Sequence, residues 1–434
     1  MAEQHVLQWE WSASPTIRAE QAGCLARAFL EETLPDEERD GARLVLTGLL
    51  EDPSALVRRV LAEHFANSDK VPHYMVHILA EDQNDIAEIV LSRSPILSDA
   101  ELIDSAATSK MFGQKAIALR PHVSAAVAAA LAEVGMVEAL ISLVQNPGAE
   151  LLDSSLHRMI ERHGHHAELR QALFARHHLS PSVRSALMGA AAKALAALLT
   201  ANDELTKEKA EILARDQRDR ANLRLAMEIC EEPRVARAFV AYLRKSGQLT
   251  AGLLLRGLFC GHKLLLERAF CELTGLPNAR VASYMATAGS AGFATLYRNA
   301  KMPEMLLPVF VAALQALTDL RLANAVDMQL QTPVIHKVLD ACQLDNPNHQ
   351  LAVSAGLRRL EAEAACEEAR LFQTLLPTWE QDNQAIQNPR PFLPPAQGEA
   401  QSSSACETSP ATSRVGSVEI AIDFDALAAA IAAA

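Results

Sequence analysis

Apolar residues recur at helical spacing along most of the chain, and short turns with proline or acidic residues separate the helical patterns. The clearest pattern repeats itself. The segment 51–61, EDPSALVRRVL, aligns without a gap with the segment 81–91, EDQNDIAEIVL, at an offset of 30 residues. In both copies an acidic turn leads into an apolar helix that ends in Val-Leu. A helical unit that recurs every few tens of residues predicts an α-solenoid, in which each unit buries its apolar face against its neighbours.

Turns and changes in composition divide the chain into predicted segments. Roughly four or five helical pairs follow one another before a long, charge-rich helix begins near residue 204. The stretch 377–417 is rich in Pro, Gln, Ser, Asn and Thr, which cannot bury a core, and this composition predicts disorder. The predicted segments are an N-terminal helical segment (1–36), helical repeats (37–200), a C-terminal helical region (201–376), a disordered linker (377–417) and a short acidic and apolar tail (418–434).

Local signals predict several helix ends. Ser98 and Glu101 have the spacing of a capping box, in which each side chain bonds the backbone amide of the other. Gly275 is expected to end the helix predicted over 263–273, because glycine adopts the left-handed conformation that closes many helices. Ser290 is expected to cap the helix that follows it.

Composition and charge narrow the classes of function. Hydrophobic residues make up 50% of the 434 residues and aromatic residues only 4%, a mixture that favours helix-on-helix packing. The formal net charge is −13, so the whole chain has no attraction for nucleic acid or anionic lipid. The seven cysteines show no CxxC spacing, and Met1–His5 lacks the features of a signal peptide. We therefore expect a cytoplasmic protein with no nucleic-acid partner and no membrane insertion.

A group of histidines raises the question of a metal site. His157, His163, His165 and His166 lie close together in the sequence, and His177-His178 follow. Imidazole suits zinc, nickel or copper, but a site needs three or four converging ligands, and no HExxH motif is present. Arg162-His163-Gly164 instead has the pattern of a helix end, with Gly164 as the cap and the cationic side chains near free carbonyl groups. We favour surface caps and predict no metal.

No motif in the sequence supports a particular reaction. The densest charge run, 215–220, mixes arginines with Asp216 and Asp219, and it is interpreted as a solvated helix face rather than a groove for an acidic partner or phosphate. The glycines near 289–292 match no phosphate-binding loop, and no GxSxG elbow occurs. Neighbouring carboxylates such as Glu231-Glu232 diverge on a helix and cannot share a proton. The sequence predicts no catalytic residue and no cofactor.

Two resemblances to known families extend this reading. The Asp-Pro-Ser-x-x-x-Val-Arg pattern of 52–58 resembles the second helix of a HEAT repeat, in which the aspartate caps the helix and the arginine braces neighbouring repeats. Over about residues 30–375 the chain resembles an uncharacterised bacterial family, common in alphaproteobacteria, with a HEAT-like N-terminal half and a helical C-terminal half. The segments that carry this likeness are 56–62, 93–98, 162–164 and 273–277. The resemblance implies an all-α, HEAT-like solenoid and cytosolic residence, and brings no catalytic residue.

Two hypotheses of function follow. The first is a non-catalytic scaffold or adaptor that binds a protein or peptide partner through the helical-repeat surface. The second is a lyase or hydrolase built on the solenoid, which a pocket with converging titratable groups would favour. The residues predicted to bind the partner are Arg58, Arg59, His64 and His73 in the early repeats, and Ile420, Ile422, Phe424 and Leu427 in the tail.

The tail allows more than one interpretation. Ile420, Ile422 and Phe424 alternate with small or acidic residues, as in a short strand, and Asp425 could instead cap a helix of the following alanines. In either form, a linker of about 40 residues could carry the segment to the solenoid or to a partner. The alternative is a frayed terminus without a function.

Overall fold

A computed structural model describes residues 12–109, 111–202, 205–229, 232–320, 329–342, 351 and 353–370. These residues are mostly helical and form no named strand; one isolated β-bridge joins Val123 to Ala149. The predicted all-α fold class is confirmed. The chain forms two compact units, residues 1–194 (unit 1) and 195–434 (unit 2). The division falls inside one helix, α13 (Pro181–Ala201), in which the predicted boundary after residue 200 also lies.

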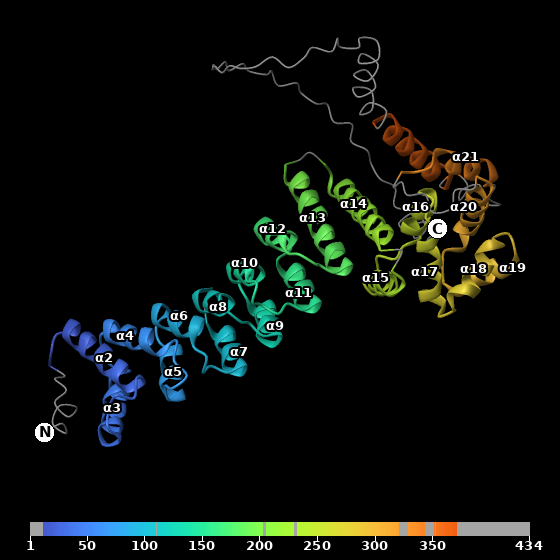
Figure 1. Ribbon diagram of the computed structural model, residues 1–434. Helices are drawn as coiled ribbons and strands as arrows, with labels where there is room; N and C mark the ends of the chain where they lie inside the picture. Colours follow the sequence, from blue (N-terminus) through green and yellow to red (C-terminus); the bar gives the residue numbers. More distant parts are fainter. Residues whose placement is uncertain are drawn as a thin grey trace, which may run out of the picture. The chain divides into compact units, whose positions relative to one another are not determined.

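Unit 1 consists of helices that alternate between two rows (Figure 1). They are α2 (Pro15–Leu30), α3 (Asp36–Leu49), α4 (Ala55–Phe65), α5 (His73–Ala80), α6 (Asn84–Arg93), α7 (Asp99–Thr108), α8 (Met111–Ala118), α9 (Ala125–Val134), α10 (Val137–Gln145), α11 (Asp153–His163), α12 (Ala167–Ala175) and the first part of α13. Each even-numbered helix from α2 to α10 packs on the next even-numbered one, and α7, α9 and α11 pack in the same way in the second row. This arrangement is an α-solenoid.

The core of unit 1 confirms the repeat found in the sequence. Val57 and Leu61 of α4 are fully buried, and their counterparts 30 residues later, Ala87 and Leu91 of α6, are also buried. Successive helices therefore place equivalent positions in one continuous core. The predicted capping box at the start of α7 is present as well, with Ser98 accepting from the Glu101 amide and Glu101 accepting from the Ser98 amide.

Polar side chains join consecutive helix pairs at the turns that lead from even to odd helices. Three side chains reach back by one repeat and donate to backbone carbonyl groups. They are Arg120 (to Leu91 and Ser94), Asn146 (to Ala118 and Arg120) and Arg176 (to Val144 and Ala149), at 2.6–3.1 Å. Because backbone carbonyls left without partners in a protein interior are costly, these bonds fix the register of one pair on the next.

The opposite turns, which lead from odd to even helices, are joined by ion pairs in the first repeats. Arg18 donates two hydrogen bonds of 2.9 Å to the carboxylate of Asp52 in the α3–α4 turn. Arg58 does the same to Asp82 in the α5–α6 turn, at 2.6 and 3.0 Å, and also donates to the Asp52 carbonyl at 2.6 Å. Asp52 in addition accepts from the Ser54 amide at 2.8 Å. Each ion pair thus connects one repeat to the next.

Unit 2 is built around α17. Helix α17 spans Lys263–Thr274, and helical residues 353–370 end the described part of the unit. The other elements are α14 (Lys207–Glu228), α15 (Pro233–Lys245), α16 (Ala251–Phe259), α18 (Asn278–Ala286), α19 (Ala291–Asn299), η1 (Glu304–Leu306), α20 (Leu307–Asp319) and α21 (Thr332–Ala341). Helix α17 packs on α15, α16, α18 and α19. As predicted, it ends at Gly275, whose φ of 71° is left-handed, and Ser290 caps α19.

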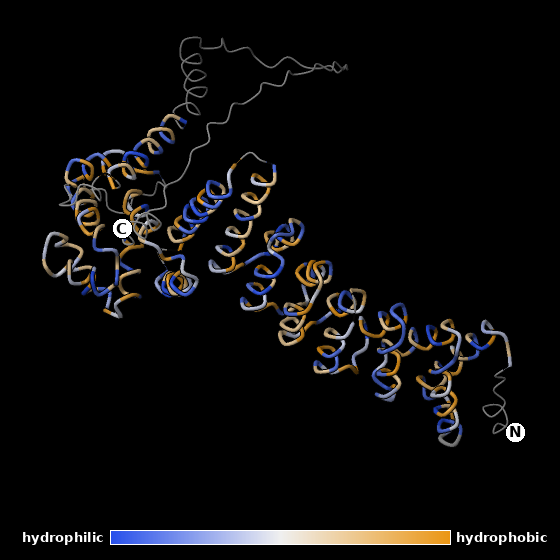
Figure 2. Tube along the Cα trace, turned by 180° about the vertical axis from the view of Figure 1, so that it is seen from behind, coloured by the Kyte–Doolittle hydropathy of each residue, from blue (hydrophilic) through white to orange (hydrophobic). Residues whose placement is uncertain are grey.

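An aromatic cluster fills the centre of unit 2. The ring of Tyr297 lies 5.3 Å from that of Phe310 and 6.4 Å from that of Phe270, in edge-to-face arrangements. Its hydroxyl donates to the carbonyl of Pro303 at 2.9 Å, so the polar end of the buried side chain is satisfied. Helix α14, by contrast, is largely hydrophilic along its length (Figure 2), and Asp216, Arg218, Asp219 and Arg220 form ion pairs within unit 2.

Helix α13 is both long and apolar. By length and composition it is the one described helix that could cross a membrane, with a mean hydropathy of 1.3. Its first half carries Val183 and Leu187, which are fully buried in the core of unit 1. These apolar residues are therefore used in packing against the solenoid.

Candidate functional site

A cleft of about 480 Å³ opens in unit 1 between two consecutive odd-to-even turns, α9–α10 and α11–α12. Its volume lies in the range of known ligand sites. The residues that line it are Val134, Gly135, Met136, Val137 and Glu138 from the first turn, and Arg162, His163, His166, Ala167 and Glu168 from the second. Apolar side chains therefore come mainly from one wall and charged or polar side chains mainly from the other.

Two glycines shape the walls of this cleft. Gly135 is the C-cap of α9 and Gly164 is the C-cap of α11, and each amide bonds the carbonyl four residues earlier. A Cβ atom at either position would lie 2.4 Å from that carbonyl oxygen, closer than atoms can approach. A larger residue would push the chain outward, so glycine allows both turns to stay tight. Gly164 acts as the predicted cap, in a right-handed conformation.

Arg162 ties the two walls together. Its Nη1 atom donates to the carbonyl of Ala132 at 2.8 Å and to that of Gly135 at 3.3 Å. The same turn is held from the other side, because the amide of Met136 donates to Gln114 at 2.9 Å and Gln114 donates to the Ala106 carbonyl at 2.9 Å. The α9–α10 turn is thereby fixed to both neighbouring repeats, which makes the cleft a preformed feature.

His163 is half-buried in the cleft, and one of its ring nitrogens is fully covered. Its Nε2 atom is inaccessible to solvent and has no hydrogen-bond partner. Burial, the charge of Arg162 and the proximity of His166 lower the pKa of His163 below its usual value, although the Gly135 carbonyl acts in the opposite direction. The imidazole is therefore neutral at pH 7. The sequence predicted a surface cap with a cationic or polar residue at this helix end, and His163 is instead half-buried, with Ala190 of α13 lying next to Gly164.

The outer part of the cleft is exposed and partly apolar. Val134 is 42% exposed and Met136 is 48% exposed, while His166, Glu138 and Glu168 lie at the surface beside them. All of these residues are described, and among them no hydrogen bond joins a histidine to a carboxylate. The arrangement can hold an apolar side chain with charged neighbours, as a protein partner presents.

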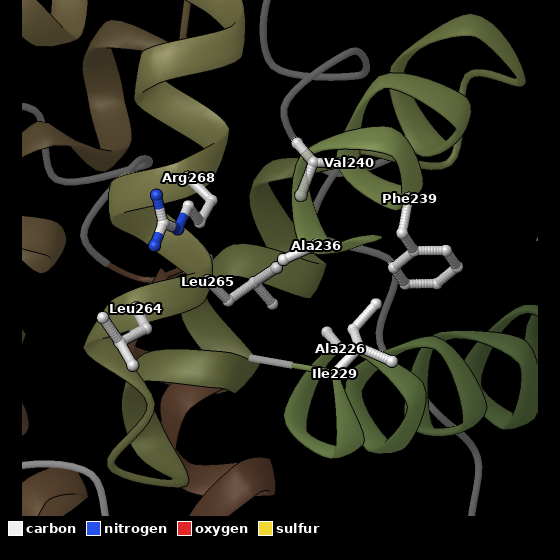
Figure 3. Close-up of a pocket in the computed structure, with 8 residues that line it drawn as sticks. All are labelled: Ala226, Ile229, Ala236, Phe239, Val240, Leu264, Leu265 and Arg268. Carbon is white, nitrogen blue, oxygen red and sulfur yellow. The ribbon is translucent and has the colours of Figure 1, made fainter. Parts of the chain in front are cut away.

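A second, much smaller pocket lies in unit 2 (Figure 3). Ala226 and Ile229 come from the end of α14 or just after it, Ala236, Phe239 and Val240 from α15, and Leu264, Leu265 and Arg268 from α17. Its volume is about 10 Å³, which is room for about one water molecule. It is a shallow apolar depression with one arginine at its side and is too small for a cofactor.

A cluster of charges lies inside unit 2. Asp216 of α14 accepts from Arg256 of α16 at 2.6 Å and from Arg220 at 2.8 Å. Arg256 and Arg220 both pair with Glu363, and Arg220 also pairs with Glu367, at 3.3 Å. The side chains of Asp216 and Arg256 are only 10% and 11% exposed. The sequence interpretation of 215–220 as a solvated helix face is wrong here, because helix 353–370 covers this part of α14.

Burial perturbs the carboxylates of this cluster. It raises the pKa of Asp219 to about 6, although Arg218 acts to lower it. Burial also raises the pKa of Glu363, against the charges of Arg256 and Arg220. The charges are therefore held in place at a cost in desolvation, and the cluster connects α14, α16 and helix 353–370.

One comparison with known proteins identifies the family. A family model described as "Uncharacterised protein conserved in bacteria (DUF2336)" matches residues 86–345, which is 260 of the 434 residues. The chain belongs to this family. Both walls of the cleft lie within the matched region. No curated protein and no solved structure matches the chain. The predicted bacterial family of unknown function is thus confirmed, and its description names no activity.

All eight predicted binding residues lie outside the region that the DUF2336 model matches. Arg58 is half-buried and braces two turns, as described above, so its guanidinium is already used within unit 1. Arg59 is exposed and pairs with Asp85. His64 is half-buried, and exposed His73 lies 3.0 Å from Glu101. The four residues lie in the early repeats, and none of them lines the cleft.

The other predicted binding residues, Ile420, Ile422, Phe424 and Leu427, lie outside the described residues. The histidine group is partly brought together: the rings of His165 and His166 are 4.1 Å apart, and His163 lies 5.9 Å from His166. Within the described part of the chain, no group of three or more His, Cys, Asp or Glu side chains has a metal-binding arrangement.

Sequence reasoning missed most of the cleft. Arg162-His163-Gly164 was noted as a helix end and as part of the family likeness, but Val134, Met136 and Glu138 were not singled out. The signal was present in part, since a valine and a methionine flank Gly135 at a helix end, where polar residues are more usual. What the sequence could not show is that this turn lies beside the next one.

Proposed function

We propose that this DUF2336 protein is a non-catalytic scaffold that binds a protein partner through the cleft between the α9–α10 and α11–α12 turns. The observation that carries the proposal is the exposed pair Val134 and Met136 on a turn fixed at both sides by Gln114 and Arg162. A preformed apolar surface with a polar rim loses little conformational entropy on binding and is typical of protein-binding sites.

Two features of the proposal follow the family resemblance. The repeats are proposed to be HEAT-like, supported by Asp52, which accepts from the Ser54 amide at the start of α4, and by Arg58, which reaches the next turn. The partner is proposed to be a protein or peptide rather than nucleic acid or a membrane, supported by the net charge of −13.

The alternative of an enzyme receives less support from the cleft. Catalysis by a histidine needs a base that is hydrogen-bonded to an orienting group or a nucleophile. The Nε2 atom of His163 has no such partner and is inaccessible. The histidines and carboxylates of the cleft, all within the described residues, are not joined by hydrogen bonds. We therefore propose binding as the function of these residues.

Site-specific cross-linking in the native cell tests the proposal. A photo-reactive amino acid replaces Met136 in one variant and Leu119, which is 53% exposed at the even-to-odd turns, in a matched control. We expect a defined protein to be cross-linked at position 136 and not at position 119. That protein is then purified and its affinity measured by calorimetry.

The affinity measurement separates the cleft from the rest of the surface. We expect Val134→Glu to raise the dissociation constant at least about tenfold, because a buried charge replaces an apolar contact at the centre of the interface. Leu119→Glu should change it less than about twofold. Equal cross-linking at both positions, or equal affinities of the two variants, would contradict the proposal.

A further inference from the structure

Helices α15 and α17 of unit 2 form a basic surface on an acidic chain. Together they carry six basic and two acidic residues, a net charge of +4, whereas the chain as a whole carries −13. On α15 all the charged residues are basic, and they are Arg234, Arg237, Arg244 and Lys245. Because like charges on packed helices repel each other, a surface of this kind is stabilised by an acidic partner.

Several of these arginines have no ion pair with another described residue. Arg244 pairs with Glu272 at 3.2 Å, but among the described residues no carboxylate lies within ion-pair distance of Arg234, Arg237 or Arg268. Arg234 and Arg237 are exposed, and Arg268 is half-buried. Their guanidinium groups are therefore available to a ligand.

Two of these arginines lie on helices that pack against each other, Arg237 on α15 and Arg268 on α17. Burial and the charge of Glu267 raise the pKa of the Cys271 thiol, while Arg268 of α17 and Arg237 of α15 both act to lower it. Both positive charges consequently lie near Cys271. Arg268 also lines the apolar depression that Ala236, Val240 and Leu265 form beside it (Figure 3). The site combines an apolar floor with the charge of Arg268 at its rim, and Arg237 directly follows Ala236, another lining residue, on α15.

A segment with the complementary pattern follows in the same chain. In 418–427, VEIAIDFDAL, the acidic residues Glu419, Asp423 and Asp425 alternate with the apolar residues Ile420, Ile422 and Phe424, and there is no basic residue. An extended segment of this kind places apolar side chains on one face and carboxylates on the other. Its net charge of −3 is opposite to that of α15 and α17.

We propose that residues 418–427 dock on α15 and α17 of their own chain, with the apolar side chains over the depression and the carboxylates near Arg237 and Arg268. The site lies in unit 2 and is independent of the cleft in unit 1. Because the depression holds about one water molecule, the segment lies across it rather than inserting deeply. Docking places carboxylates of the segment beside the basic surface.

The length of the chain allows this contact. Residues 371–417 connect the last described helix to the segment, and 47 residues can span at most about 150 Å. A folded unit of about 175 residues has a radius of gyration of about 16 Å. The connection therefore reaches any point on unit 2. Tethering supplies an effective concentration of about 1 mM, so a contact with a dissociation constant of about 0.1 mM is mostly occupied.

Photo-cross-linking in the full-length protein tests the docking. A benzophenone amino acid replaces Ala428, directly after the segment, and the cross-linked peptides are mapped by mass spectrometry. We expect intramolecular cross-links to 233–245 and 263–274, with a yield independent of protein concentration. Arg237→Glu with Arg268→Glu should reduce that yield at least about fivefold, and Asp423→Arg with Asp425→Arg in the same chain should restore it.

A matched control and a fold check complete the experiment. Arg280→Glu removes another exposed arginine without an ion-pair partner among the described residues, on α18, and should leave the yield unchanged. If the double charge reversal unfolds unit 2 by circular dichroism, Arg237→Gln with Arg268→Gln replaces it and should reduce the yield at least about twofold. Cross-links to other helices, cross-links between chains, or a yield that the arginine variants do not change would overturn the proposal.

Discussion

Each of the two units of this protein is stabilised internally by a different kind of interaction. In unit 1 the bonds between helix pairs join residues 22–34 positions apart, and many run from a side chain to a backbone carbonyl. In unit 2 the charge cluster joins α14 to residues 40–147 positions away, on α16 and on helix 353–370. Bonds of the first kind recur from one repeat to the next. The charge cluster of unit 2 is a single set of contacts between segments that are distant in the sequence. Repetition therefore makes unit 1 uniform, while unit 2 depends on a few buried charges.

The largest effect is expected from removing one charge of the cluster. Arg256→Met keeps most of the side-chain volume but leaves Arg220, which is more exposed, as the remaining counter-charge of Asp216 and Glu363 among the described residues. Removing one partner of a buried ion pair costs about 3–5 kcal/mol, and Arg220 offsets only part of this loss. Hydrogen exchange should report this loss in α14, α16 and helix 353–370 and no change in α4–α12.

The matched control for this variant is Arg298→Met, which breaks an exposed pair with Glu304 in the same unit. Exposed pairs contribute less than about 1 kcal/mol. If the two variants lose the same stability, the buried cluster does not hold unit 2 together.

A smaller loss is expected in unit 1 from Arg120→Met. Arg120 is 9% exposed and donates to two carbonyl groups of the preceding turn. Leaving these buried acceptors unsatisfied costs about 2–3 kcal/mol. Hydrogen exchange should rise in α6–α9 while unit 2 stays unchanged. Arg93→Met, at an exposed position on α6, is the control and should have little effect; equal losses would show that the bonds at the turns do not determine register.

The smallest of these effects is a gain in stability. Because burial raises the pKa of Asp219 to about 6, the folded state binds a proton that the unfolded state has already lost at that pH. Its ionised form therefore weakens unit 2 above pH 6, and this cost disappears as the pH falls toward 4. Asp219→Asn should stabilise unit 2 by about 1–2 kcal/mol at pH 7.5 and by much less at pH 4.5. A gain that is the same at both values would contradict the raised pKa.

The same contrast explains what the sequence could predict. The 30-residue repeat, the capping box at Ser98 and the helix end at Gly275 were all predicted, because each depends on residues close together in the chain. The cleft was missed, because the apolar residues at 134 and 136 acquire their meaning only beside the turn at 162–168. The role of Asp216 was predicted wrongly, since its neutralising partner Arg256 and the covering helix 353–370 are distant in sequence. Local patterns determine the helices, and distant contacts determine the sites.

Because different interactions stabilise the inside of each unit, we expect the stabilities of the two units to respond to pH in opposite directions. In unit 1 burial lowers the pKa of His157 and of His163, which favours their neutral forms in the folded state. The free energy of unfolding of unit 1 is therefore highest above pH 6.5 and falls as the pH falls and these histidines must be protonated. In unit 2 burial raises the pKa of Asp219 to about 6, so the folded state gains from protonation of Asp219 over the same range, and burial raises the pKa of Glu363 in the same direction.

Hydrogen exchange of the full-length protein at pH 7.5 and pH 5.0, corrected for the intrinsic pH dependence of exchange, measures both responses at once. We expect the free energy of opening to fall at pH 5.0 in α9–α12 and to rise in α14, α16 and helix 353–370. A change of the same sign in both units would contradict the account.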